Sequence, residues 1–308
     1  MINLLNVFTN SMTALAMCIL IGYILRKFNV INDNQISGFS QILMKVALPA
    51  TIFISLMRVF DVSLLIESAL TFLITSIIYI LGGLIGKLIA RLVNASERES
   101  ESYTFGTAYG NVAFMGFPVI IAIFGHEGMI YAAMATASFN VLTFTVGVRI
   151  FKNAPPEAKR VKFLFKNPAL LSTIIGLIFF VSGLRFPAAI ENGIALLGGL
   201  TTPLSMILIG AILGRHKLKE SFIDKKLILP SAARLIVIPM LSFFALYFLL
   251  PNQLMLGTIV TLMAMPAAAS TAIFAEQFQS DTHAAAKIVV VSTILSMITI
   301  PLMMLIFL

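Results

Sequence analysis

Two uncharged stretches of this sequence combine a proline near the middle with amide-bearing or small side chains. In residues 102–125, Asn111 precedes Pro118 by seven positions. In residues 254–274, Pro266 is followed by a run of small and hydroxyl-bearing residues: Ala267, Ala268, Ala269, Ser270 and Thr271. Proline suits the first turn of a helix, which presents free N–H groups and roughly half a positive charge. Two such helix ends could hold an anion without any basic side chain.

Each of these features also has a purely structural explanation. Pro118 and Pro266 could simply kink packed helices. Asn111 could donate to a carboxylate through its amide, or it could only cap a helix. The residues from Ala267 to Thr271 could let a ligand approach and offer it two hydroxyls, or they could serve close helix packing. We favour the functional explanation for the prolines and for Asn111, and both explanations stay open for the small residues.

Three further polar side chains lie inside apolar sequence, where polar groups of membrane proteins usually face a cavity or a partner. Lys45, four residues before Pro49, could offer a counter-charge to an anion, stand where a coupling ion would bind, or snorkel to the interface. Asn140 could donate into the same cavity or bond a neighbouring helix. We expect Arg234 to snorkel or to pair with a helix C-terminus rather than to bind substrate.

The sequence leaves the coupling ion open between Na⁺ and H⁺. No acidic residue falls at the depth predicted for the middle of a membrane, so no central proton relay is visible. Glu276 could accept a proton, although a solvated helix end is the favoured interpretation. A sodium site would have to use uncharged oxygens, for which the candidates are Thr51, Ser55, Asn140, Thr202 and Ser205. The three histidines lie in predicted loops without metal-ligand spacing, so we expect no metal site and no cofactor.

The elements that must position these residues are predicted to be membrane-spanning helices. Of the 308 residues, 59% are hydrophobic and 11% are charged, and the mean hydropathy is +1.01, which excludes a soluble domain. The last but one of the uncharged stretches is twice as long as a single helix needs, and Pro251 marks its turn. Ten spans are therefore expected, from the uncharged stretches 1–25, 46–57, 68–86, 102–125, 128–148, 167–184, 192–214, 235–275 and 288–308. The second span extends back through Lys45 to about Ile36.

Charge placement predicts how these spans are oriented. Alternate loops hold 17 of the 21 lysines and arginines, and by the positive-inside rule they are cytoplasmic. Both termini then lie outside the cytoplasm, in a multi-pass protein of the inner (plasma) membrane. The net charge of +8 is accordingly a topology signal, and we expect contact with lipid headgroups and none with nucleic acid.

Two halves of opposite orientation are predicted on either side of a cytoplasmic linker. Residues 151–166 separate five spans in 1–150 from five in 167–308, and an odd number of spans inverts the second half. A shift of 154 positions places Pro49 on Pro203, which agrees with an inverted repeat. Spans 1, 2, 6 and 7 would form one panel, and spans 3–5 and 8–10 the other.

Several longer motifs carry a resemblance to a known family. They are GNVAFMGFPVIIAIFG at 110–125, NPALLSTIIGLI at 167–178, TPLSMILIGAIL at 202–213, RLIVIP at 234–239 and AMPAAASTAIFAEQF at 264–278. In order and spacing they resemble the auxin efflux carrier family over essentially the whole chain. Without a long loop between spans 5 and 6, the chain is similar to compact prokaryotic members.

The resemblance implies both a fold and an activity. The fold is all-α, with ten helices in two inverted repeats like those of bile acid–sodium symporters, and spans 4 and 9 are broken and cross. The activity is secondary transport of organic anions, which are auxins in plants and dicarboxylates such as malate or malonate for some bacterial members. Asn111 matches an asparagine that the family uses for substrate contact.

The expected function is therefore secondary active transport, such as symport, of a small organic anion by alternating access. A membrane receptor or scaffold on the same fold would need an output domain, and the longest loop is too short for one. An anion channel is a further alternative. No catalytic dyad is apparent within the spans, so we do not expect an enzyme. A homodimer is one assembly that we consider.

Overall fold

The computed structural model describes residues 2–154, 167–215 and 224–307, and these residues form helices and connecting segments. Most of the linker predicted at 151–166 and much of the basic loop 215–226 lie outside the described residues. Two compact units are present. Unit 1 comprises residues 1–69, 113–137 and 165–217, and unit 2 comprises 70–112, 138–164 and 218–308.

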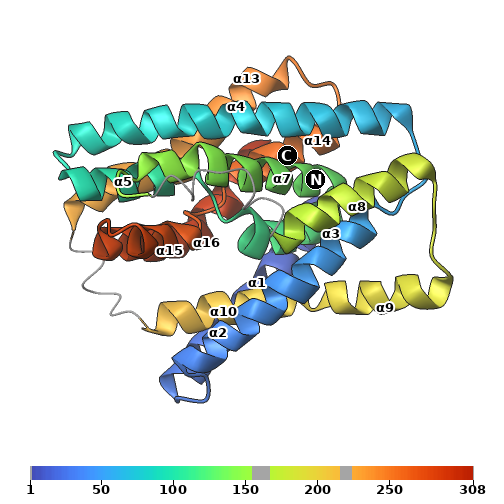
Figure 1. The fold of residues 1–308 in the computed structure, drawn as a ribbon, viewed down its shortest axis with the longest axis horizontal. Helices are drawn as coiled ribbons and strands as arrows, with labels where there is room; N and C mark the ends of the chain where they lie inside the picture. The colour runs from blue at the N-terminus through green and yellow to red at the C-terminus, as the bar shows by residue number, and fades with distance from the viewer. Residues whose placement is uncertain (1, 155–166, 216–223, 308) are drawn as a thin grey trace. The chain divides into compact units, whose positions relative to one another are not determined.

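Unit 1 contains the N-terminal helices and the first helices of the second half of the chain. Within it α3 packs against α8 and α9, and α1 packs against α10; Figure 1 shows α3 and α8 side by side. The elements are α1 (Ile2–Lys27), α2 (Asp33–Ile42), η1 (Leu43–Ala47), α3 (Leu48–Leu56), α6 (Phe117–Phe124), α8 (Pro168–Ser182), α9 (Ala188–Gly199) and α10 (Thr201–Arg215).

Unit 2 contains α5 and the C-terminal helices. Its long α16 packs against both α5 and α15. The elements are α5 (Glu97–Ala108), η3 (Gly147–Ile150), η6 (Lys225–Leu227), α12 (Ile228–Ala232), η7 (Ala233–Val237), α13 (Ile238–Tyr247), α14 (Gln253–Met263), α15 (Ser270–Gln277) and α16 (Thr282–Phe307). Three elements have residues in both units: α4 (Val62–Leu92), η2 (Val112–Gly116) and α7 (Met129–Thr145).

Helix starts follow from local side-chain chemistry. Ser96 begins α5 with a capping box, in which its hydroxyl accepts from the Glu99 N–H and the Glu99 carboxylate accepts from the Ser96 N–H. Asn252 caps α14 by accepting from the N–H groups of Leu254 and Met255. The helix start at Gln253 confirms the turn predicted from Pro251 within the longest uncharged stretch.

Three prolines follow a π-helical turn at the same distance along the chain. The turns η1, η2 and η7 each end two residues before a proline, which is Pro49, Pro118 or Pro239. Proline has no N–H to donate, and its ring clashes with the carbonyl of the preceding turn. A local widening to π geometry relieves that clash without ending the helix. Lys45 and Arg234 both lie within such turns.

The described helices are long and apolar enough for a multi-pass membrane protein. Six continuous helical segments reach spanning length, and shorter apolar helices occupy 112–124, 168–182 and 253–263. The six are Asp33–Leu56, Val62–Leu92, Met129–Ile150, Ala188–Gly214, Lys225–Tyr247 and Thr282–Phe307. Each uncharged stretch of the sequence overlaps one or more of the described helices. The finer prediction of two inverted five-helix repeats stays a prediction.

Candidate functional site

The chain leaves helical geometry in the middle of both proline-containing stretches. The helix α5 ends at Ala108, and its C-cap Tyr109 has extended backbone angles, φ −108° and ψ 111°. Helical geometry resumes at Val112 in η2. In the second stretch α14 ends at Met263 and α15 begins at Ser270. Each break exposes the carbonyls of one helix end and the N–H groups of the next helix start.

The two breaks pair with each other inside unit 2. Gly110 and Ala267 form an antiparallel bridge. The Asn111 N–H donates to the Pro266 carbonyl at 2.7 Å, and the Ala268 N–H donates to the Tyr109 carbonyl at 2.9 Å. The pairing satisfies backbone groups that could not face lipid. Residues 157 positions apart in sequence are thereby fixed side by side.

Arg234 closes the carbonyl ends of both broken helices. Its side chain is fully buried, with 0% exposure. Nε, Nη1 and Nη2 together make five N–H···O contacts of 2.8–3.4 Å, and a guanidinium has five N–H donors. The acceptors are the carbonyls of Thr107 and Ala108 at the end of α5 and those of Leu262, Met263 and Met265 at and after the end of α14.

Of the two expectations for Arg234, pairing with a helix C-terminus is therefore confirmed. The signal for it was an arginine within apolar sequence just before a proline. The sequence did not reveal that one guanidinium would serve two helix ends. Because every N–H donor is used, Arg234 has none left for a substrate.

Pro118 lies in the first turn of a helix, as predicted, whereas Pro266 does not. Pro118 does lie in the first turn of α6, but the helical backbone already begins at Val112, because the π turn absorbs the proline. The prediction that Pro266 starts the second helix of its stretch is wrong. Pro266 lies in the extended segment, where its carbonyl accepts from Asn111, and α15 begins four residues later. The helix starts at the breaks are thus those at Val112 and Ser270. The N–H groups of Val112, Thr271 and Ala272 already donate to the carbonyls of Gly110, Ala268 and Ala269.

The start of α15 carries two hydroxyls that lack a partner. The oxygens Oγ of Ser270 and Oγ1 of Thr271 are buried and have no hydrogen bond among the described residues. Thr271 is 0% exposed, and a Cβ built on Gly106 would lie 3.5 Å from its methyl group, which places it beside the last turn of α5. A buried hydroxyl without a partner is costly, so a polar ligand at this point would be stabilised.

The other candidates of unit 2 differ in how far they are buried. Asn111 is half-buried at the break, and Asn140 is buried in α7 with 7% exposure. Ala267 is fully buried, and its N–H donates to the Ser292 hydroxyl at 3.1 Å, so that N–H is already satisfied. Within the described part of the chain, no hydrogen bond joins the Asn111 side chain to Ser270 or Thr271.

Comparison with known proteins decides the family. A family model described as "Membrane transport protein" matches residues 7–162 and 157–304. The chain belongs to this family, the auxin efflux carriers. An uncharacterized transporter of Methanothermobacter thermautotrophicus is 29% identical over 296 residues, which cover 96% of each chain. The uncharacterized transporter YfdV of Escherichia coli K12 is 21% identical, with 97% of each chain covered.

One relative has a name that includes a substrate. The protein of Rhizobium meliloti named "Putative malonate transporter" is 24% identical over 247 residues, or 74% of each chain. The relatives and the family are membrane transporters, so this protein is a transporter and not an enzyme. It works in a lipid bilayer on a small-molecule substrate.

In unit 1 the Lys45 side chain is exposed. Its ammonium donates to the Gln41 side chain at 3.1 Å, one turn closer to the N-terminus. That direction leads toward the end of the helix that carries Asp33, which the charge pattern assigns to the cytoplasmic side. The contact therefore agrees with the snorkelling alternative for Lys45.

The candidate oxygens for a coupling ion hold helices of unit 1 together. The Thr51 hydroxyl contacts the carbonyls of Ala47 and Gly198 and the Thr201 hydroxyl, at 2.8–3.0 Å. Ser55 donates to the Ile52 carbonyl within its own helix. These bonds tie α3 to the last turn of α9 and to the first residue of α10. The hydroxyls of Thr51 and Ser55 are accordingly committed to structure.

The remaining coupling-ion candidates have simple surroundings. Ser205 is buried and donates to the carbonyl of Thr202, which is half-buried. Glu276 is exposed in the last turn of α15, which agrees with a solvated helix end. In the described ranges, no group of three or more His, Cys, Asp or Glu residues could hold a metal ion.

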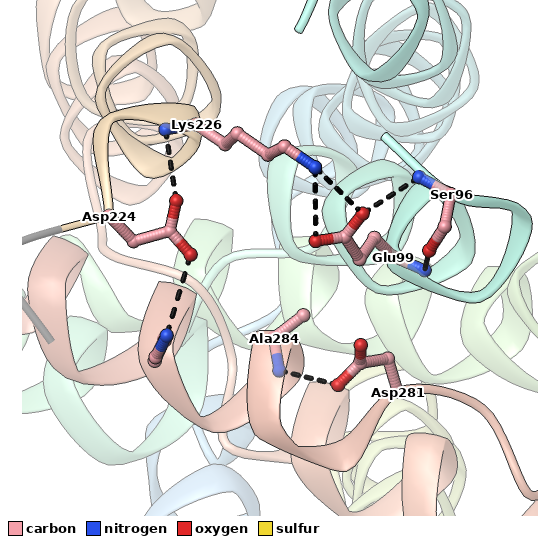
Figure 2. A network of polar contacts seen from close by, with 7 residues as sticks. Ser96, Glu99, Asp224, Lys226, Asp281 and Ala284 are labelled. Carbon is pink, nitrogen blue, oxygen red and sulfur yellow. Dashed lines mark hydrogen bonds and ion pairs between the residues drawn. The ribbon is translucent and has the colours of Figure 1, made fainter. Parts of the chain in front are cut away.

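Polar contacts fix the ends of α5, η6 and α16 in unit 2 (Figure 2). The Lys226 ammonium bonds both carboxylate oxygens of Glu99 at the start of α5, at 3.1 and 3.4 Å. Asp224 accepts from the Lys226 N–H and from the Lys287 ammonium, and Asp281 accepts from the Ala284 N–H at the start of α16. Burial alone would raise the pKa of Glu99, but hydrogen bonds from Ser96 and Lys226 hold that pKa below its ordinary value.

Proposed function

We propose that this protein is a secondary transporter of small organic anions that binds its substrate at the paired breaks of unit 2. The carrying observation is the pairing of Gly110 with Ala267, which sets two helix starts next to extended backbone inside a buried region. The positive end of the helix dipole at each of these helix starts favours an anion. No basic side chain is required for that preference.

The side chains at the breaks supply donors suited to a carboxylate. Asn111 offers an amide N–H₂ group at the first helix start, and Ser270 and Thr271 offer hydroxyls at the second. Arg234 is excluded as a substrate ligand because its donors are used up. A carboxylate bound by backbone and neutral side chains can be released more easily than one paired with a buried arginine, which suits a carrier.

The substrate class that we propose is mono- or dicarboxylates, including malate, malonate and auxin-like acids. The relative of Rhizobium meliloti named for malonate supports the dicarboxylate part of this class. Movement would follow alternating access, with spans 1, 2, 6 and 7 as one panel and spans 3–5 and 8–10 as the other. Both termini would lie outside the cytoplasm, in the inner membrane.

Uptake into proteoliposomes tests this function. Purified protein is reconstituted, and uptake of labelled malonate and of an aromatic monocarboxylate is measured with counterflow, which separates a carrier from a pore. We expect saturable uptake that falls at least roughly tenfold in Asn111→Ala, since a charge-assisted hydrogen bond contributes about 1.5–3 kcal/mol.

Matched variants separate the site from general damage. Asn34→Ala removes an exposed asparagine in α2 and should transport at the wild-type rate. Thr271→Val should impair uptake, whereas Thr258→Val, which removes another buried hydroxyl without a partner in α14, should not. If Asn111→Ala and Pro266→Ala both transport at the wild-type rate, the site is wrongly assigned.

A further inference from the structure

We propose that Arg234 is a built-in cation that takes the place of a bound metal ion at the paired breaks, so that neither Na⁺ nor K⁺ is needed there. The inference rests on the proposed function, because it concerns what the same transporter couples to. It starts from the surroundings of Arg234, which differ from those of an ordinary buried arginine. Among the described residues, carbonyl oxygens and no carboxylate accept its hydrogen bonds.

A cluster of carbonyl oxygens at broken helices is the coordination shell that transporters offer to alkali cations. Unwound backbone carbonyls and the C-terminal ends of half-helices bind such ions in many transporter folds. Here five carbonyls of that kind converge on one guanidinium at 2.8–3.4 Å. The guanidinium occupies the space between them and satisfies their lone pairs, so a metal ion has neither room nor ligands.

The charges also balance without a metal ion. The C-terminus of a helix carries roughly half a negative charge, so the ends of α5 and α14 together carry about one. The guanidinium carries one positive charge and is fully buried beside both ends. A buried charge is strongly unfavourable unless it is paired, and the two helix ends are the pairing partner in this case.

The backbone is shaped to admit the guanidinium. A Cβ at Gly110 would overlap Nη2 of Arg234 and approach its Cζ and Nε atoms within 2.8 and 3.1 Å, so only glycine leaves room. Arg234 itself lies in the π turn η7, whose wider geometry precedes Pro239. The network of Figure 2 fixes the chain ten residues earlier, where Asp224 contacts Lys287.

A tethered cation has a functional consequence that a bound ion does not have. Na⁺ can dissociate and thereby couple its gradient to a conformational change, whereas Arg234 is covalently attached and remains in every state. The charge at the paired breaks is therefore constant through the transport cycle. Binding of the anion at the helix starts does not require prior binding of an alkali cation at this position.

The wild-type protein gives the first test, and it needs no substrate. Melting temperatures are measured in detergent with chloride salts of choline, Na⁺ and K⁺ at equal ionic strength. An ion that binds the folded state raises the melting temperature of the protein by mass action. We expect the same melting temperature in all three salts. A selective increase with Na⁺ or K⁺ in the wild type would overturn the proposal.

Removal and chemical replacement of the guanidinium give the second test. Arg234→Ala should lower the melting temperature by roughly 10 °C, because five buried carbonyls lose their donors. Added guanidinium, at concentrations that do not denature the wild type, should restore part of that loss by entering the vacated space. Arg185→Ala is the matched control, since Arg185 pairs with Glu191 at an exposed position and should show no such rescue.

Two results of the second test would contradict the proposal. One is an unchanged melting temperature in Arg234→Ala, and the other is equal rescue of Arg234→Ala and Arg185→Ala by guanidinium. If Arg234→Ala yields no folded protein, Arg234→Lys replaces it. We expect the melting temperature of Arg234→Lys to be lower than that of the wild type and to be the same in Na⁺ and choline salts. If the wild type takes up no anion, the proposed function is rejected, but the melting results still test the role of Arg234.

Discussion

Gly110 lies directly against the guanidinium of Arg234, so closely that a Cβ on residue 110 would overlap the Nη2 atom. The contact joins the first break of the chain to an arginine 124 positions later. It makes a glycine obligatory for steric reasons, since the backbone of Gly110 has no positive φ. The same residue forms the bridge with Ala267, so one position supports both the pairing and the arginine.

Gly110→Ala should therefore destabilise the protein and impair transport. Overpacking in a buried, hydrogen-bonded region costs about 1–3 kcal/mol, and displacement of Arg234 adds uncovered carbonyls. Thermal unfolding measures the effect. Gly83→Ala is the control, because a Cβ there meets nothing within 4 Å, and alanine is the better helix former. Equal melting temperatures of Gly110→Ala and wild type would show that the space beside Arg234 is wider than described.

Ser292→Ala should weaken the second break. The Ser292 hydroxyl is fully buried and accepts from the Ala267 N–H at 3.1 Å. Its loss leaves a buried backbone donor unsatisfied, which costs about 1–3 kcal/mol. Amide hydrogen exchange at Ala267 and the melting temperature report the change. Ser63→Ala, at an exposed position in α4, should alter neither quantity; unchanged protection of Ala267 in Ser292→Ala would contradict the assignment.

Thr51→Val should lower stability without changing the ion dependence of transport. The Thr51 hydroxyl bonds the Gly198 carbonyl at 2.9 Å and the Thr201 hydroxyl at 2.8 Å, so its removal costs about 1–3 kcal/mol. Thr202→Val changes a half-buried threonine nearby and should have a smaller effect. A loss of sodium dependence in Thr51→Val would instead identify Thr51 as an ion ligand.

The network around Glu99 predicts a loss of stability in acid. Because Ser96 and Lys226 hold the pKa of Glu99 below its ordinary value of 4.5, the folded state binds the proton less tightly than the unfolded state. This contribution is fully present above pH 4.5 and is lost as the pH falls through the lowered pKa. Glu99→Gln should remove that part of the acid sensitivity. If the melting temperature falls equally with decreasing pH in wild type and Glu99→Gln, this contribution of Glu99 is contradicted.

Much of this architecture is readable from sequence, and the reasons differ between elements. Apolar length predicts the helical segments, because a membrane span needs a continuous run of about 20 residues. Gly110 and Pro266 mark both breaks, because neither residue supports a regular helix interior. Pro118 does not mark the first helical residue, which is Val112, since a π turn can precede a proline within a continuous helix.

Long-range partners could not be predicted in the same way. Arg234 contacts α5 and α14 from 126 and 29 positions away, and nothing local to Arg234 names those acceptors. The bond between Thr51 and Gly198 is equally distant, so Thr51 was a plausible ion ligand until its partners were visible. Sequence restricted the role of Arg234 to two explanations, and the geometry selected one.

Binding of carboxylates to purified protein tests the anion site at the paired breaks most directly. Melting temperatures are recorded with a series of mono- and dicarboxylates, with and without sodium, for wild type, Asn111→Ala and Asn34→Ala. We predict that at least one carboxylate raises the melting temperature of wild type and Asn34→Ala, and that this increase is lost in Asn111→Ala. An equal increase in all three proteins would place the anion elsewhere and contradict the account.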